Sequence, residues 1–272
     1  MVDGMARSAR RDSTLRMIVL PRAVERDRRR GRSGAAARNG TVAGMSETTR
    51  SRVAALLLVL GPLAFTLGDL LRRVVVPSGN PTAVSITQAV SDHQATWLAA
   101  GLLNLLTGFL LMPGALALIP ASGLRGARLT TIGAVMVAVG SVAAAAHSIA
   151  FFSPYALYAK ASAPAATVTA IDNASESYPL LIAVIAIFMI GMMLGSLLLF
   201  IGLRRARRVP IWSVVAVVVF VVSGSTGGVL PGVLGVVAGM VAFVPAARSL
   251  VRSEATTQPS SRPWTRTSYS HR

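Results

Sequence analysis

Only a few residues in the apolar parts of this sequence could take part in acid–base chemistry. Asp69 lies near the end of one long apolar run, and His147 lies near the end of another. A carboxylate and an imidazole within hydrogen-bonding distance can act as a general acid–base pair. Ionisable groups inside apolar segments are costly and often functional. Asp69 and His147 are therefore the candidate catalytic residues.

The same side chains are candidates for a metal site. His93, His147, Asp69 and Glu176 carry the nitrogen and oxygen ligands that Zn²⁺ and related ions accept. Their spacing contains neither a His-Glu-x-x-His motif nor a tight histidine cluster, and the chain has no cysteine. We find no phosphate loop or dinucleotide fingerprint either. No metal or other cofactor is predicted.

Structural roles also account for these residues. Arg72 and Arg73 follow Asp69 at helical i+3 and i+4 spacing, which predicts an ion pair. A hydrogen bond to a neighbouring helix would satisfy His147, and Asn104 would make a polar contact between helices. Both the structural and the functional interpretations stay open at this point.

The composition indicates which elements position these residues. The chain is 53% hydrophobic and 14% charged, whereas soluble domains carry about 25% charged residues. A membrane-spanning helix needs about 20 mostly apolar residues, and four segments meet this condition: 53–71, 97–119, 129–152 and 179–203. The run 211–247 is interrupted at 224–228, which favours a hairpin of two helices with a short first member; a single span and a re-entrant segment remain alternatives. The predicted fold is an all-α, polytopic transmembrane helix bundle of about six spans over residues 53–250.

The basic residues predict the orientation. They lie in short blocks that flank the apolar runs, all on one side of a six-span bundle, at 50–52, 125–128, 204–208 and 248–252. By the positive-inside rule both termini are cytoplasmic, and Arg72–Arg73 is an exception. Trp97, Tyr178 and Trp212 begin spans, where aromatic rings favour the interface. The polar candidates are then expected to converge at the outer side: Asp69, Asp92, His93, Asn104, His147 and Glu176.

The segments outside the spans are polar and basic. Residues 1–52 predict a disordered basic cytoplasmic tail, and 251–272 predict a second cytoplasmic tail. Met45 opens a short polar leader before the first span and is the expected true start. Because the arginines flank apolar runs, no nucleic-acid partner is expected. The composition, with a single lysine among 27 basic residues, favours a bacterial protein of the plasma membrane.

Two outer loops, 72–96 and 153–178, share one plan. Each is expected to hold a short amphipathic helix, the first with an N-cap at Asn80 and an apolar face containing Ala83, Ile86 and Val90, the second with Val168 and Ile171. A shift of 81 residues places Trp97 on Tyr178 and 112–116 on 193–197. We infer a repeat of two hairpins in the same orientation, 53–119 and 129–203.

Small residues at helical spacing predict close helix contacts. Gly191 and Gly195 form one such pair, and Gly235 and Gly239 form another. In lipid, such faces let helix backbones approach closely. The expected partners are the lipid bilayer and, through these four glycines, a second copy of the chain.

Three short motifs carry a resemblance to known proteins. Residues 61–65 (GPLAF), 97–102 (WLAAGL) and 125–129 (RGARL) resemble uncharacterised actinobacterial multi-pass membrane proteins, which are grouped as domains of unknown function. The resemblance covers about 53–250 and rests mostly on the hydropathy plan. It implies a cell-membrane location, and it transfers no functional residue.

Three functions are compatible with these features. The scarcity of polar groups within the spans favours a non-enzymatic bundle that interacts with lipids or partners. The repeat and the Pro/Gly-interrupted helices favour a small-molecule or lipid transporter. An enzyme would use Asp69 and His147 at the outer leaflet.

Overall fold

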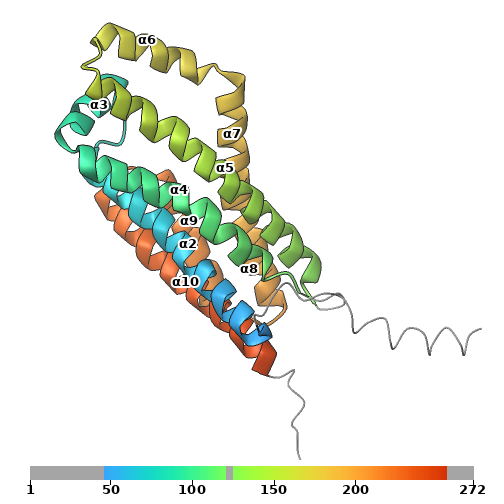
Figure 1. The fold of residues 1–272 in the computed structure, drawn as a ribbon. Coiled ribbons are helices and arrows are strands. Elements are labelled where there is room, and N and C mark those ends of the chain that lie inside the picture. The colour runs from blue at the N-terminus through green and yellow to red at the C-terminus, as the bar shows by residue number, and fades with distance from the viewer. Residues whose placement is uncertain (1–45, 121–124, 256–272) are drawn as a thin grey trace, which may run out of the picture. The chain divides into compact units, whose positions relative to one another are not determined.

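The computed structural model describes residues 46–120 and 125–255, and all the regular elements in these two ranges are helical (Figure 1). Five helical segments are long and apolar enough to cross a membrane, and a sixth, Ile211–Ser225, is shorter. This confirms an all-α, polytopic bundle. The predictions for residues 1–45, for the start at Met45 and for 256–272 lie outside the described residues. Residues 47–52 and 251–255, which were assigned to the two tails, lie in helices instead. In chain order the elements are α2 (Glu47–Val75), α3 (Ala83–Asp92), α4 (Gln94–Leu116), α5 (Ala127–Lys160), α6 (Ala165–Glu176), α7 (Pro179–Met189), the π-helix η1 (Ile190–Leu194), α8 (Gly195–Arg205), α9 (Ile211–Ser225) and α10 (Val229–Ala255).

Two of the predicted spans differ from the helices observed. The third was expected to end at Phe152, but α5 continues through Pro154 to Lys160. Its 34 residues measure about 51 Å, which exceeds the hydrocarbon core of about 30 Å. The fourth is one helical path of three parts, because the π-helix η1 lies between α7 and α8. A π-helical turn inserted in an α-helix is frequently a feature of functional sites.

The two long loops, 72–96 and 153–178, contain the expected short helices. Helix α3 buries Ala83, Ile86 and Val90, as predicted, but its N-cap is Thr82 rather than Asn80, because the Thr82 side chain accepts a hydrogen bond from the Ser85 amide. Helix α6 buries Val168, whereas Ile171 is 46% exposed, so only one of the two residues predicted for its apolar face is buried. The Tyr155 hydroxyl on α5 donates to the Asp172 carboxylate on α6 at 3.0 Å and ties the two helices together.

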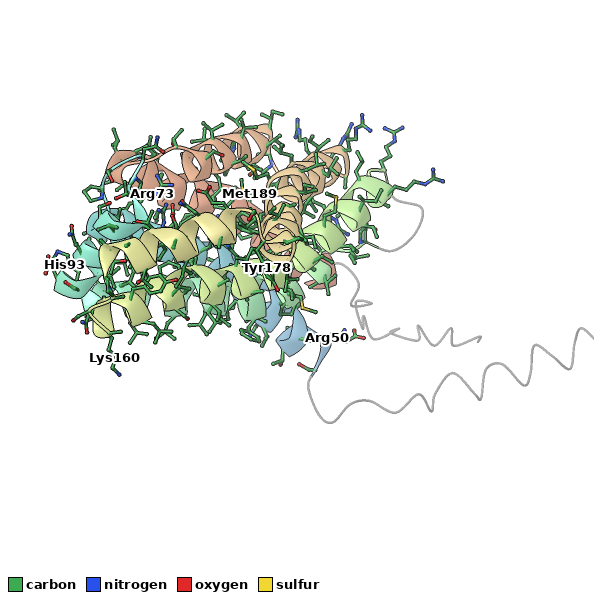
Figure 2. The ribbon with its side chains drawn as sticks, turned by 90° about the horizontal axis from the view of Figure 1, so that it is seen from above. Arg50, Arg73, His93, Lys160, Tyr178 and Met189 are labelled. Atoms are coloured by element: carbon green, nitrogen blue, oxygen red, sulfur yellow. The ribbon has the colours of Figure 1, made fainter. Side chains whose placement is uncertain are left out.

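The helices pack in an order that closes on itself. Helix α2 lies between α10 and α4, α4 packs on α5, α5 packs on α7, η1 and α8, and α9 contacts both α8 and α10. One part of the bundle is filled by apolar side chains such as Leu58, Leu111, Leu199, Phe200 and Phe243. Arg50 and His93 appear toward opposite ends of the bundle (Figure 2).

Glycines bring the helices of each hairpin into backbone contact. A Cβ on Gly61 of α2 would lie 2.7 Å from Leu111 Cβ on α4, and a Cβ on Gly140 of α5 would lie 2.8 Å from the Met192 nitrogen on η1. Gly114 approaches Leu58 in the first hairpin as Gly195 approaches Val137 in the second. These contacts repeat with offsets of 79 residues in the first helix of each hairpin and 81 residues in the second.

The helices α2–α3–α4 and α5–α6–α7/α8 therefore share one packing plan. The match does not extend to every aligned pair. Trp97 was expected at the membrane interface, and that expectation is wrong: the residue is 1% exposed, and its indole nitrogen donates to the Phe152 carbonyl at 2.9 Å. Tyr178, which the repeat aligns with Trp97, is exposed.

The four glycines expected to form an oligomer face are buried within the chain. A Cβ on Gly191 would lie 2.5 Å from Gly140 Cα, and one on Gly195 would lie 2.8 Å from Met136 Cβ. Gly235 and Gly239 are buried too, facing α2 and α9. Contacts within the chain thus account for these residues. Self-association itself stays a prediction, without this surface to support it.

Candidate functional site

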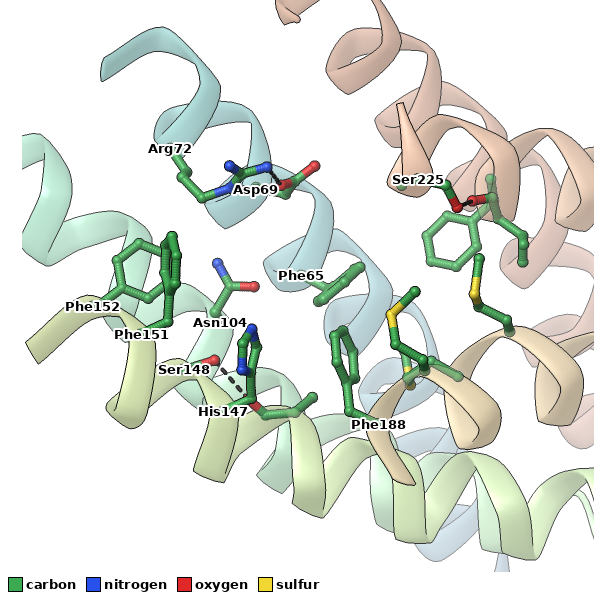
Figure 3. A pocket seen from close by; sticks show the side chains of 17 residues that line it. Phe65, Asp69, Arg72, Asn104, His147, Ser148, Phe151, Phe152, Phe188 and Ser225 are labelled. Atoms are coloured by element: carbon green, nitrogen blue, oxygen red, sulfur yellow. Dashed lines mark hydrogen bonds and ion pairs between the residues drawn. The ribbon is translucent and has the colours of Figure 1, made fainter. Parts of the chain in front are cut away.

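A cavity of about 280 Å³ lies between α2, α4, α5, the α7/η1 segment and α9 (Figure 3). Helices α5 and α7 separate beyond the contact of Gly140 on α5 with Gly191 on η1 (Figure 1). Helices that meet at small residues and cross at an angle diverge on either side of the crossing. The close contact thus leaves space farther along the two helices.

Phenylalanine and methionine are the commonest residue types in the wall of the cavity. Five phenylalanines and three methionines line it: Phe65, Phe151, Phe152, Phe188, Phe220, Met189, Met192 and Met193. Met192 and Met193 belong to the π-helix η1, so the irregular turn shapes one wall. Flexible methionine side chains adapt to ligands of varied shape. Such a lining favours an apolar body over a strongly hydrated one.

The structure brings both candidate catalytic residues to this cavity but does not pair them. Asp69 and His147 both line it, with Asn104 between them in Figure 3. Both carboxylate oxygens of Asp69 are bound by arginine. The His147 ring stacks on Phe188 of α7 with centroids 5.5 Å apart, and no described residue is its hydrogen-bond partner. The hydrogen bond expected for His147 is thus replaced by ring stacking.

Asn104 contacts α2 without a hydrogen bond to it. Its amide nitrogen donates to the Ala100 carbonyl on its own helix at 2.9 Å. The amide packs where Gly68 has no side chain, since a Cβ on Gly68 would lie 2.3 Å from that nitrogen. The role of Asn104 between helices is therefore steric packing against a glycine.

The metal candidates are only partly brought together. Within 46–120 and 125–255 no three His, Cys, Asp or Glu residues are grouped closely enough to hold a metal ion. Glu176 and His147 line a second cavity of about 350 Å³ beside α6, together with Tyr155 and Asp172. Asp92 and His93 are exposed and line neither of these cavities.

The Asp69–Arg72–Arg73 cluster forms the polar end of the first cavity. Arg72 Nη2 lies 2.8 Å from Asp69 Oδ1, and Arg73 Nε lies 2.6 Å from Asp69 Oδ2, as the helical spacing predicted. The two arginines differ in burial, because the Arg72 side chain is 30% exposed and that of Arg73 is 2% exposed.

Arg73 has a second role that the sequence did not reveal. Its guanidinium donates to the carbonyls of Ser223 and Gly228 at 3.0 Å each, to that of Gly224 at 3.4 Å, and to that of Thr226. The last carbonyls of a helix lack partners within it. Helix α9 has 15 residues, about 22 Å, and ends short of a full membrane crossing of about 30 Å. Arg73 thus supplies hydrogen-bond donors to the carbonyls at the end of α9 and in the turn that follows it.

Comparison with protein-family models, with curated proteins and with solved structures finds no match. The cavity and the residues around it are therefore interpreted from their own chemistry.

Proposed function

We propose that this integral membrane protein binds a small amphipathic molecule or lipid in the cavity between its two hairpins and does so without catalysing a reaction. The residues that line the cavity are the main support for this proposal: five phenylalanines and three methionines surround about 280 Å³, together with a few polar groups that include Asp69 and Arg72. Ligand sites are typically cavities of about 300–1,000 Å³ with an apolar wall and a few placed polar groups. Asp69 is held by arginines, which argues against its use as a base.

The surroundings of α7 give a ligand a path from the bilayer. None of the residues of α7, all of which are described, is buried. Phe188 and Met189 at its end line the cavity, and η1 follows directly. A single thinly packed helix therefore separates the cavity from the position of the lipid chains. Elements with few buried contacts are the first to open.

Filling the cavity tests the proposal. Gly224 lines the cavity, and a Cβ built there meets no atom within 4 Å. In Gly224→Phe the ring is expected to occupy the ligand's space. We expect dodecanol to raise the Tm of the detergent-purified wild type by mass action but to leave the Tm of Gly224→Phe unchanged. Val222→Phe on the same helix is the matched control, because Val222 is 55% exposed and does not line the cavity. A dodecanol-induced Tm shift that is equal in both variants and the wild type would contradict the proposal.

A transporter is the second candidate, and the repeated packing plan favours it. Phe65 and Asp69 of the first hairpin line the cavity, and so do Ala144 and Ser148, which correspond to them at the offset of 79 residues. Sites between repeats are typical of transporters. Transport would be identified if a fluorescent alkyl probe crosses the membrane of proteoliposomes that contain the wild type but not of those that contain Gly224→Phe. If the probe binds the wild type but does not cross the membrane, the protein binds its ligand without transporting it.

We further propose a bacterial plasma-membrane location with both termini in the cytoplasm, and membership of the actinobacterial family that the sequence resembles. Because the chain contains no cysteine, single cysteines report topology without background. In intact cells a membrane-impermeant maleimide is expected to label Ser177→Cys beside α6. Arg128→Cys at the start of α5 is expected to react only after permeabilisation. The opposite labelling pattern would reverse the orientation.

A further inference from the structure

We propose that the molecule bound in the cavity is an anionic amphiphile, with a carboxylate or phosphate head on Arg72 and its hydrocarbon chain among the phenylalanines. This inference rests on the proposed binding function and adds the chemistry of the head group. It is carried by the unequal bonding of the two arginines and by the position of Arg72 between the first cavity and a smaller polar cavity.

The hydrogen bonds leave Arg72 with donors to spare. Its Nε and Nη2 both approach one oxygen, Asp69 Oδ1, at 3.1 Å and 2.8 Å. A guanidinium has five N–H donors in a planar fork, and no described residue accepts from Nη1 of Arg72. Arg73, in contrast, has the other Asp69 oxygen and four carbonyls. One carboxylate therefore serves two guanidinium groups, and the uncompensated positive charge lies on Arg72.

Arg72 lies at the junction of an apolar and a polar cavity. A smaller polar cavity, of about 170 Å³, lies between the end of α2, the segment 76–81 and the turn 224–228, and glycine, serine and arginine predominate among its lining residues. Arg72, Gly224 and Ser225 line both cavities. An amphiphile whose hydrocarbon chain fills the first cavity would thus place its head at Arg72, with the polar cavity beyond it. Two adjoining spaces of opposite polarity match a molecule with a tail and a head.

The charges disfavour a cationic head. Among the described residues that line the first cavity, Asp69 is the single acid, and arginine occupies both of its oxygens. A cation would have to displace a guanidinium at about 2.6–2.8 Å from the carboxylate. An anion needs no displacement, and planar carboxylates and phosphates suit the guanidinium fork.

The test compares three ligands with one chain length on the purified full chain in a non-ionic detergent. Dodecanoate and dodecyl phosphate are expected to bind the wild type at least about tenfold more tightly than dodecanol, because a charge-assisted hydrogen bond adds that much affinity. In Arg72→Gln this preference is expected to disappear, while dodecanol binds as before. Arg128→Gln, which removes an exposed charge at the start of α5, is the matched control and should keep the preference.

The outcomes distinguish a failure of the anionic head group from a failure of the proposed binding function. If dodecanol binds the wild type as tightly as both anions, or if Arg72→Gln keeps the full preference, the anionic head is refuted and the binding function stands. If none of the three ligands binds the wild type, the binding function fails. A preference for only one of the anions assigns the head as carboxylate or as phosphate. An unchanged Tm of ligand-free Arg72→Gln establishes that the variant is folded.

Discussion

Replacement of Arg73 by methionine is expected to lower the free energy of unfolding by about 3–5 kcal/mol, the range for breaking a buried ionic network by removing one member. The loss follows from the environment of this side chain, which is 2% exposed and donates to Asp69 and to four carbonyls at the end of α9. Methionine fills much of the same volume but donates no hydrogen bond. The Ser223 carbonyl would remain buried without this donor, and the carbonyls of Gly224, Thr226 and Gly228 would lose it in a part-buried site.

The neighbouring arginine provides the control for this prediction. Arg72 binds the same carboxylate, but its side chain is 30% exposed, so Arg72→Met is expected to cost no more than about 1 kcal/mol. Arg73→Lys keeps the positive charge but loses the planar set of guanidinium donors, so its loss of unfolding free energy should lie between those of Arg72→Met and Arg73→Met. Unfolding in detergent, followed by near-UV circular dichroism, measures all three. Proteolysis within 224–228 should accelerate in Arg73→Met alone. Equal losses for Arg72→Met and Arg73→Met would refute the specific role of Arg73.

The second large effect is expected at the crossing of α5 with η1. A Cβ on Gly140 would lie 2.7 Å from Gly191 Cα, and one on Gly191 would lie 2.5 Å from Gly140 Cα. Because these neighbours are backbone atoms, no side-chain rotation can make room. Gly140→Leu should therefore force the helices apart at a cost of about 3 kcal/mol, the upper part of the usual range for overpacking. Loss of packing in the thermal unfolding curve and a fall in monodisperse yield are the measurements.

Gly235→Ala is the matched control, since it also changes a buried glycine in a helix. The nearest atom to its Cβ would be Ser223 Cβ at 3.6 Å, an ordinary contact. Alanine favours a helix over glycine by about 0.5–1 kcal/mol, so this variant should be as stable as the wild type or slightly more stable. If Gly140→Leu unfolds at the same temperature as Gly235→Ala, the close crossing does not determine the stability of the bundle.

Individual residues illustrate which site features the sequence could predict. The pairing of Asp69 with Arg72 and Arg73 was predictable, since three- and four-residue spacing places side chains on one helix face. The carbonyl partners of Arg73 were not, because they lie about 150 residues farther along the chain. The prediction for Trp97 was wrong for a similar reason. Its position at the start of a span can be read from the local sequence, whereas its burial depends on Phe152 from another helix.

The sequence by itself determined the apolar helical segments, the short helices of the loops 72–96 and 153–178 and the break at 224–228. These features follow from local hydropathy and from backbone hydrogen bonding within each segment, which lipid makes obligatory. The tertiary structure alone decided that α5 extends to Lys160, that a π-helix interrupts the fourth span, and that Asp69 and His147 share a cavity without bonding to each other. Cavities depend on where helices touch and at what angle they diverge, and contacts such as Gly140 with Gly191 join residues from separate segments.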